Sequence, residues 1–342
     1  MTAATTQTVR VWLPAALAPV AARLGRADEL EYQLGMAAFD WSRGEPLHLK
    51  QVRNEDGVTA DVTVTGLRPI PPLIAMLFSE AVHHLRAALD NVVFHLVTDA
   101  RGSALPDDEA RQVAMPIYPS ADKLSKWGKR VGVKVPELAP GTTLFGRIES
   151  LQPYANSHSV PSIPAQLTAF MGAGQHEHPL LLLQAYSNAD KHQSMRLAHG
   201  LSLFQSDDQP FGSVPLAMRS VSEGEVILTV RLDQPLILES HAAVHVYRPD
   251  DVTTVAPGAE LDHLHSFVAD TAIPTLVTGG APVRPALARQ VRLHDTGETL
   301  QARVDYGSDW HSAKVRVQGD IDQAMLEAGT QPVPVLPVDD NN

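Results

Sequence analysis

Two segments of the chain, Phe78–Val97 and Leu180–Ala198, carry many polar side chains on an otherwise apolar background. Each gathers His, Asp, Asn and Arg or Lys within about three helical turns, which is more ionisable chemistry than a buried helix usually tolerates. If the two segments were neighbouring helices, a histidine could act as general acid or base while an arginine or lysine met an anion. The candidate catalytic residues are His83, Arg86, Asp90, Asn188, Asp190 and His192.

The first segment belongs to a helical pattern over Ile74–Val97 that has one apolar and one polar face. On the polar face, His83, Arg86 and Asp90 stand at i, i+3 and i+7, within reach of one ligand. Arg86 and Asp90 can also pair directly. Three interpretations fit this pattern: a solvated face with ion pairs, a buried polar network between helices, and a functional site. The solvated face is the simplest of the three.

In the second segment, Asn188 and His192 project from the same side of a helix. If they are buried they must be hydrogen-bonded, and the polar face of the first helix is the obvious source of partners. The sequence therefore predicts a structural clasp between the two helices. Asp190 lies beside apolar residues and would need a partner such as an arginine, whereas Lys191 is most simply a solvated charge.

Four short motifs occur in a fixed order along the chain: LRAALD (Leu85–Asp90), PIYPS (Pro116–Ser120), IESLQPY (Ile148–Tyr154) and NADKH (Asn188–His192). This series resembles a widespread set of uncharacterised bacterial and phage-associated proteins, and the resemblance covers about residues 75–200. It implies a bacterial protein whose helices meet through these polar residues, with no established activity to carry over. The chain departs from the pattern in two places. Leu follows His84 where the pattern has Asn, and Gln193 replaces the usual Arg.

A helical nuclease of the HEPN type is the main enzymatic alternative. Such folds place an arginine and a histidine on one helix and cleave RNA without a metal. That family has Arg, four residues, then His, whereas the fifth residue after Arg86 is Asn91 and the next histidine is His95. Because the spacing does not match that motif, we rank the nuclease below a binding protein and keep it as the alternative.

Metal and cofactor chemistry find little support in the sequence. Histidines cluster at 176–178, at His241 with His245, and at 262–265, but none of these has the spacing of H-E-x-x-H or of a facial triad. Phosphate-binding loops, dinucleotide motifs and the G-x-S-x-G elbow are also missing. We therefore expect no metal and no cofactor.

The composition of the chain limits the classes of partner that we expect it to bind. The chain has 342 residues, no cysteine and a net charge of −12, so attraction to a nucleic-acid backbone or an anionic membrane is not expected. No apolar run approaches the roughly 20 residues that span a bilayer. Residues 11–22 superficially resemble a signal-peptide core but contain Pro14 and Pro19. We expect a cytoplasmic protein with a protein or small-molecule partner whose identity the sequence does not give.

Periodicity predicts the order of elements. Helices are expected over 21–41, 74–97 and 121–130, with further helices over 262–277 and 285–293, the former ambiguous with a buried strand. A hairpin is expected over 47–65, an antiparallel sheet over 200–248, and a last strand over 313–317.

These observations predict an α+β protein with a helical N-terminal half, built on two long polar-faced helices, and a smaller antiparallel β-rich C-terminal half. The expected domains are residues 1–199, 200–329 and a disordered tail over 330–342. The expected function is binding or interaction, with a polar helix pair that is architectural.

Overall fold

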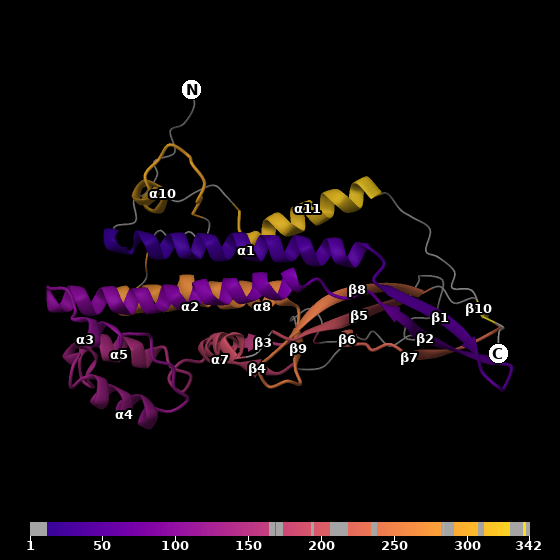
Figure 1. Cartoon of the computed structure of the whole chain (residues 1–342), viewed down its shortest axis with the longest axis horizontal. Coiled ribbons are helices and arrows are strands. Elements are labelled where there is room, and N and C mark those ends of the chain that lie inside the picture. Colours follow the sequence, from indigo (N-terminus) through magenta and orange to yellow (C-terminus); the bar gives the residue numbers. More distant parts are fainter. Residues whose placement is uncertain are drawn as a thin grey trace.

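The computed structural model describes residues 12–163, 168, 174–192, 195–205, 218–233, 238–281, 283, 291–306, 311–328 and 338–339. Its fold is α+β, as the sequence predicts. Two long helices, α1 (Ala18–Arg43) and α2 (Pro72–Arg101), run side by side and form the spine of the molecule (Figure 1). Pro72 occupies the first turn of α2, where its missing N–H is harmless, and Gly102 ends the helix with a φ of 72°.

A hairpin of β1 (Leu47–Arg53) and β2 (Thr59–Leu67) joins the two long helices, as predicted. Smaller helices follow α2 and gather at its C-terminal end (Figure 1). They are α3 (Asp107–Ala110), α4 (Ala121–Val131) and α5 (Thr143–Ser150), with a 3₁₀ turn at Pro136–Leu138 between α4 and α5. Another 3₁₀ turn, Ala15–Leu17, directly precedes α1. The helix expected over 121–130 is therefore confirmed.

The second polar segment forms α7 (Pro179–His192), preceded by the short pair β3 (Val160–Pro161) and β4 (His176–Glu177). The remaining strands are β5 (Leu197–Gln205), β6 (Met218–Ser220), β7 (Val226–Arg231), β8 (Leu238–Tyr247) and β9 (Thr254–Val255). One sheet has the order β6-β5-β8-β9, with antiparallel neighbours.

The prediction of one sheet over 200–248 needs a correction at β7. This strand pairs with β2 of the N-terminal hairpin, with Val62 opposite Leu228. It belongs to a second sheet of order β10-β1-β2-β7, in which β10 is the short strand Val338–Asp339. The physical reason is burial. Val62 and Val64 point to one face of β2, and they form a small separate core with Val221. Leu228 and Val230 of β7 pack against this core, so β7 extends the apolar face of the hairpin by one strand.

The C-terminal region contains more helix than predicted. The predicted helix over 262–277 is confirmed as α8 (Pro257–Phe267), a π-helical turn (Val268–Ala272) and α9 (Ile273–Thr278). The wider π turn accommodates Pro274, which cannot donate a hydrogen bond. Further helices are α10 (Leu300–Tyr306) and α11 (Ala313–Ala328). The predicted helix over 285–293 lies mostly outside the described residues.

One prediction near the C-terminus is wrong, and a second falls mostly outside the described residues. The expected strand over 313–317 is the first part of α11, because buried Asp28 on α1 accepts a hydrogen bond from the Ala313 N–H at 2.8 Å and pairs with Arg316. In the expected disordered tail, β10 (Val338–Asp339) pairs in parallel with β1. Both outcomes depend on contacts between distant parts of the sequence.

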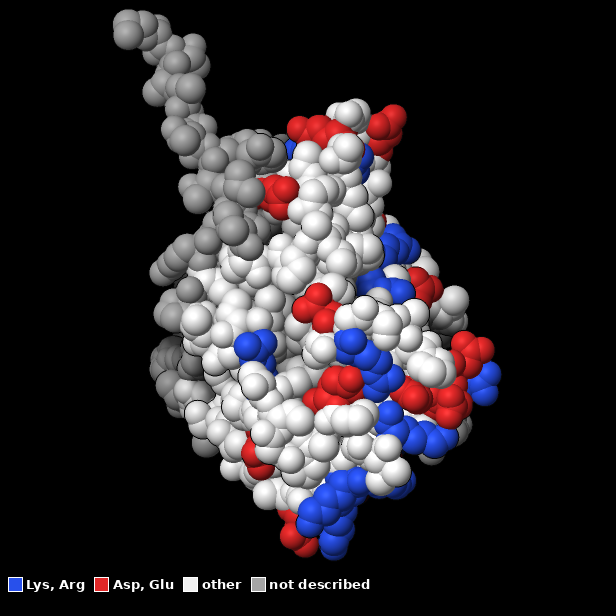
Figure 2. Space-filling model, turned by 90° about the vertical axis from the view of Figure 1, so that its left-hand side faces the viewer, with Lys and Arg blue, Asp and Glu red and all other residues white. Residues whose placement is uncertain are grey.

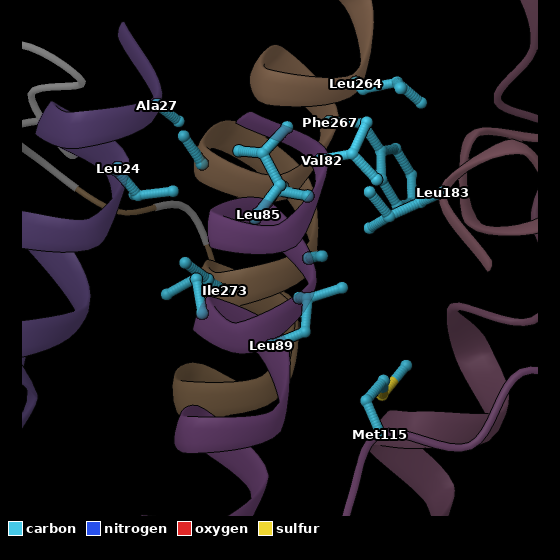
Figure 3. Close-up of a cluster of buried hydrophobic side chains, with 14 of the residues drawn as sticks. Leu24, Ala27, Val82, Leu85, Leu89, Met115, Leu183, Leu264, Phe267 and Ile273 are labelled. Carbon is cyan, nitrogen blue, oxygen red and sulfur yellow. The ribbon is translucent and has the colours of Figure 1, made fainter. Parts of the chain in front are cut away.

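One hydrophobic core extends through the helical layers. α2 lies at its centre, with α1 on one side and α7, α8 and α9 around it (Figure 3). Leu264, Phe267 and Ile273 pack in this core beside Leu85 of α2. The strand β5 runs across residues 199 and 200, where the sequence predicts a domain boundary. Within the described part of the chain, no helix is long and apolar enough to cross a membrane.

Candidate binding sites around helix α7

The polar face of α2 is engaged with the chain segment that follows α3. Arg86 Nη2 donates a 2.6 Å hydrogen bond to the carbonyl oxygen of Met115, and Asp90 Oδ1 accepts one of 2.8 Å from the Met115 N–H. The two side chains also form an ion pair of 3.2 Å. Burial lowers the pKa of Arg86, and the charge of Asp90 partly opposes that effect. Arg86 and Asp90 therefore connect α2 to the backbone of Met115 in the irregular segment after α3.

Gln152 holds the same segment from the other side. Its Oε1 accepts a 2.8 Å hydrogen bond from the Tyr118 N–H, and its Nε2 lies 3.0 Å from the Pro116 oxygen and 3.1 Å from the Ile148 oxygen. The side chain is fully buried. Residues 115–118 are thus clamped between α2 and the end of α5. We call this arrangement of Arg86, Asp90 and Gln152 the Met115 clamp. It gives a structural role to residues of three of the four motifs.

His83 is exposed on α2, and its ring centroid lies 6.0 Å from that of His84. His84 is half-buried, and its Nδ1 has no hydrogen-bond partner among the described residues. Burial lowers the pKa of His84, and the charges of Arg23, His83 and Arg26 lower it further. Neither histidine belongs to the Met115 clamp.

The predicted clasp between the two polar helices does not form through Asn188. Asn188 is exposed, and α2 and α7 meet through apolar contacts such as the edge-to-face pair of Phe78 and Tyr186, whose centroids are 5.0 Å apart. Asp190 is exposed as well, and no buried arginine pairs with it among the described residues. The side chains of Lys191 and His192 lie outside the described part of the structure.

Asn188 and Asp190 line two different pockets. Residues two apart on a helix point to nearly opposite sides, because each step turns the helix by about 100°. Asn188 lines a pocket of about 360 Å³, and Asp190 lines a groove of about 740 Å³. The structure therefore places the candidates of α7 at separate sites, apart from the Met115 clamp.

The larger site, which we call the apolar groove, lies between the start of α2, the end of α7 and β5. Its apolar lining includes Ile70, Met76, Met195 and Leu197, and its carboxylates are Glu80 and Asp190.

The wall of the apolar groove near Pro69 is held in place by hydrogen bonds. Trp41 Nε1 donates to the Pro69 oxygen at 3.1 Å, and His199 Nε2 lies 3.0 Å from the Arg68 oxygen. A carbonyl oxygen can only accept, so the proton of His199 is on Nε2 in this contact. These two contacts hold the backbone of residues 68 and 69, which forms this wall of the groove.

The smaller site, which we call the polar pocket, lies on the other side of α7 against β4 and the turn after β8. Its polar lining includes Gln175, Glu177, Gln184, Asn188, Arg248 and Asp250.

A buried charged network lies behind the polar pocket. Arg248 donates from Nε and Nη2 to the two oxygens of Glu260 at 3.0 and 2.9 Å, and Nη2 also lies 3.2 Å from the Val160 oxygen. Tyr186 Oη donates to Glu260 at 3.0 Å. Burial raises the pKa of Tyr186, and the charge of Glu260 raises it further. Arg248 Nη1 is buried without a hydrogen-bond partner among the described residues.

His178 starts α7. Its Nδ1 accepts a 3.2 Å hydrogen bond from the Leu180 N–H, which caps the helix and requires a neutral ring with its proton on Nε2. Burial lowers the pKa of His178 to about 4, with a further contribution from His158. Its ring packs edge-on against Phe267, with centroids 5.5 Å apart. A residue from a histidine cluster thus serves as a helix cap.

The histidines of the cluster at 262–265 also have structural contacts. His265 Nδ1 lies 3.6 Å from Glu31 on α1, and His263 Nδ1 lies 2.7 Å from the Ala259 oxygen. Across the described residues, no group of three His, Cys, Asp or Glu side chains has a geometry that could hold a metal ion.

Surface charge is mixed on the face at the C-terminal end of α2. Lys and Arg lie next to Asp and Glu there (Figure 2), as in the pairs of Arg101 with Glu137 at 2.8 Å and Lys134 with Asp108 at 2.7 Å. Charges of both signs therefore share the described part of this face.

Sequence reasoning missed most residues that line the two sites. Met76 lies off the predicted apolar face of α2, and this position is a signal for a second apolar contact. Met195 and Leu197, which complete the groove, come from a distant part of the sequence, so periodicity does not connect them with Met76. Comparison with known proteins gives no further guide, since no family model, no curated protein and no solved structure matches this chain.

Proposed function

We propose that this chain is a bacterial, cytoplasmic binding protein whose apolar groove receives an amphipathic segment of a partner protein that carries lysine or arginine. The observation that carries the proposal is the groove itself, an open apolar site of about 740 Å³ with carboxylates in its lining. Concave apolar sites with a few polar groups are the usual places for ligands.

The size of the apolar surface favours a protein segment as the ligand. Met76 is 58% exposed, and Leu73, one helical turn before it, is 53% exposed, so the apolar surface continues past the groove along α2. Methionine side chains adapt to different partners, and Met76 and Met195 are both in the lining. An amphipathic helix fits such a surface by laying its apolar face into the groove.

The charge of the groove favours a basic ligand. Glu80 and Asp190 are both exposed, and no Lys or Arg is present among the described residues that line the groove. Arg26 lies 3.9 Å from Glu80, an exposed pair that contributes little. A lysine or arginine beside the apolar face of the partner would therefore meet Asp190.

The alternative, a metal-independent nuclease, finds less support in the geometry. Arg86 is bonded to Met115 and Asp90, while Asn188 and Asp190 line separate sites. A general acid and an anion-binding group would have to converge on one substrate. RNA incubated with the wild-type protein tests this directly, since cleavage that His83→Ala abolishes would favour the nuclease.

The proposal is tested with a fluorescent helical peptide that has leucines on one face and lysines beside them. Wild type should raise the anisotropy of this peptide, and Met76→Asp should weaken binding at least tenfold, because a charge in the groove is desolvated by the bound peptide. Val133→Asp is the matched control, since Val133 is 82% exposed and outside the groove. Equal loss in both variants, or no binding by wild type, would contradict the proposal.

A further inference from the structure

Four cations form a stripe along the exposed side of α4, at the opposite end of α2 from the apolar groove (Figure 1). We call Lys123, Lys126, Lys129 and Arg130, which are all exposed, the basic stripe. They lie within about one third of the helix circumference, and the stripe is about 10 Å long at a rise of about 1.5 Å per residue. In Figure 2, Lys and Arg side chains gather at the lower end of the face, where Figure 1 places α4.

Three cations of the basic stripe are not matched by a carboxylate. Lys126 lies 3.5 Å from Asp122, but the side chains of Lys123, Lys129 and Arg130 have no ion pair or hydrogen bond with any described residue. Like charges three or four residues apart on a helix repel each other and destabilise it. An anionic partner that meets the basic stripe therefore relieves this repulsion.

The apolar side of α4 is already used within the fold. Leu124 is fully buried and Val131 is 3% exposed, while Gly128 packs so close to α5 that a Cβ there would lie 2.5 Å from the Phe145 ring. The helix thus cannot lay its apolar side into a lipid surface, as an interfacial helix does. A partner meets its charges and the side chain of Val133, which is 82% exposed in the turn after α4.

Carboxylates lie at both ends of the basic stripe. Asp122 precedes it and, with Glu149, lines a hollow of about 500 Å³ beside the start of α4. At the other end, Lys134 pairs with Asp108 at 2.7 Å. A long polyanion would bring its further charges against these carboxylates, within the range of about 10 Å over which charges interact at 0.1 M salt. An extended peptide segment of about three or four residues spans only the stripe itself.

We propose that the basic stripe docks a short acidic segment of a partner protein, with an apolar side chain of that segment against Val133. The carboxylates of the segment pair with the three unmatched cations. Each exposed contact of this kind is weak, so the contacts act together and the affinity depends on salt. The net charge of −12 does not prevent docking, because distant acidic residues are screened beyond about 8 Å at physiological salt.

The test is the fluorescence anisotropy of a labelled peptide with four glutamates followed by one leucine, mixed with the full chain at low salt. Wild type should bind the peptide saturably, and Lys123→Gln with Arg130→Gln should weaken binding at least fivefold. Arg196→Gln with Arg231→Gln is the matched control. It removes the same charge from exposed ion pairs at the strands, away from α4, and should change the affinity less than twofold (Figure 1). No binding by wild type, or equal loss in the two double variants, would overturn the proposal.

Two single variants separate the basic stripe from the apolar groove. Val133→Asp and Met76→Asp each add one negative charge at an exposed apolar position. Only Val133→Asp should weaken binding of the glutamate peptide, by at least threefold, and Met76→Asp should leave it unchanged. The same loss in both variants would show that net charge alone governs binding and would overturn the proposal.

Salt and competing polyanions identify the class of partner. Raising the salt from about 25 to about 200 mM should weaken binding of the glutamate peptide at least fivefold, because exposed charges are screened. Peptide binding at the apolar groove is therefore measured at the higher salt. An RNA strand with as many charges as the peptide, or a vesicle of anionic lipid, that binds the basic stripe more tightly than the peptide would overturn the proposal in favour of that partner.

Discussion

Arg86 and Asp90 bind the two backbone groups of Met115: Arg86 donates to the Met115 oxygen, and Asp90 accepts from the Met115 N–H. Both backbone groups of one residue are thereby satisfied by side chains one helical turn apart. This contact places the side chain of Met115, which is 1% exposed, in the core beside α2 (Figure 3). The most conspicuous polar pair of the sequence is accordingly a structural connection.

The Met115 clamp predicts that substitutions at two positions of α2, Asp90 and His83, change the unfolding free energy by different amounts. Asp90→Ala leaves the Met115 N–H without its acceptor and Arg86 without its counter-ion, so unfolding free energy should fall by about 1 to 3 kcal/mol. His83→Ala, on the exposed part of the same helix, should change it by less than about 0.5 kcal/mol. Urea unfolding of both variants measures this, and equal stability of the two would contradict the clamp.

Substitution of Gln152 should lower the stability of the protein at least as much as substitution of Asp90. Gln152→Leu has a similar size but removes contacts to three backbone groups in a fully buried position. We expect a loss of about 2 to 4 kcal/mol, since each buried backbone group left unpaired costs about 1 to 3 kcal/mol and the losses overlap. Thermal unfolding measures the change. A melting temperature within a degree or so of wild type would show that water replaces Gln152 without loss.

The buried pair of Arg248 and Glu260 predicts a large effect from a small change. Glu260→Gln removes the charge that compensates Arg248, and breaking a buried pair in this way costs about 3 to 5 kcal/mol. Asp251→Asn is the control. It breaks the exposed pair of Asp251 with Arg196, worth less than about 1 kcal/mol, and Asn tolerates the φ of 60° at this position. Chemical denaturation of the two variants compares them, and similar losses would contradict the network.

His178 makes stability depend on pH. Its pKa is about 4 in the folded protein and close to 6.5 in an unfolded chain, so between these values the unfolded state binds a proton that the folded state does not. Stability should therefore fall as pH is lowered from about 6.5 to 4, by roughly 1 to 3 kcal/mol from this residue.

His178→Asn tests this pH dependence, because asparagine also caps helices but does not titrate. The variant should lose less stability than wild type between pH 7 and pH 4.5 in denaturant titrations. An identical slope in the two proteins would show that His178 is not the titrating group.

Local pattern predicted much of the fold and little of the sites. The long helices, the hairpin and α4 have strong periodicity and clear ends such as Pro72 and Gly102, and these elements were predicted correctly. The strand predicted over 313–317 failed because Val315 and Val317 favour strands, whereas the helix there is set by Asp28 from α1. Pairing of β7 with β2 was equally invisible, since sheet neighbours do not follow from periodicity.

The candidate site shows the same limit. Spacing correctly brought Arg86 and Asp90 together, because neighbours at i, i+4 are fixed by helix geometry alone. Their real partner, Met115, lies in an irregular segment with no periodicity to reveal it. Asn188 and Asp190 were grouped with the candidates of α2 although they face pockets formed by residues from distant parts of the sequence.

The most direct test of the apolar groove is a charge exchange between protein and peptide. Glu80→Lys with Asp190→Lys reverses the charge of the groove, and the leucine peptide is made in two forms, one with lysines and one with glutamates. Wild type should bind the lysine form more tightly, and the double variant should bind the glutamate form more tightly, each by at least tenfold. If the double variant keeps the preference of wild type, the carboxylates do not select the partner and the proposed binding site is wrong.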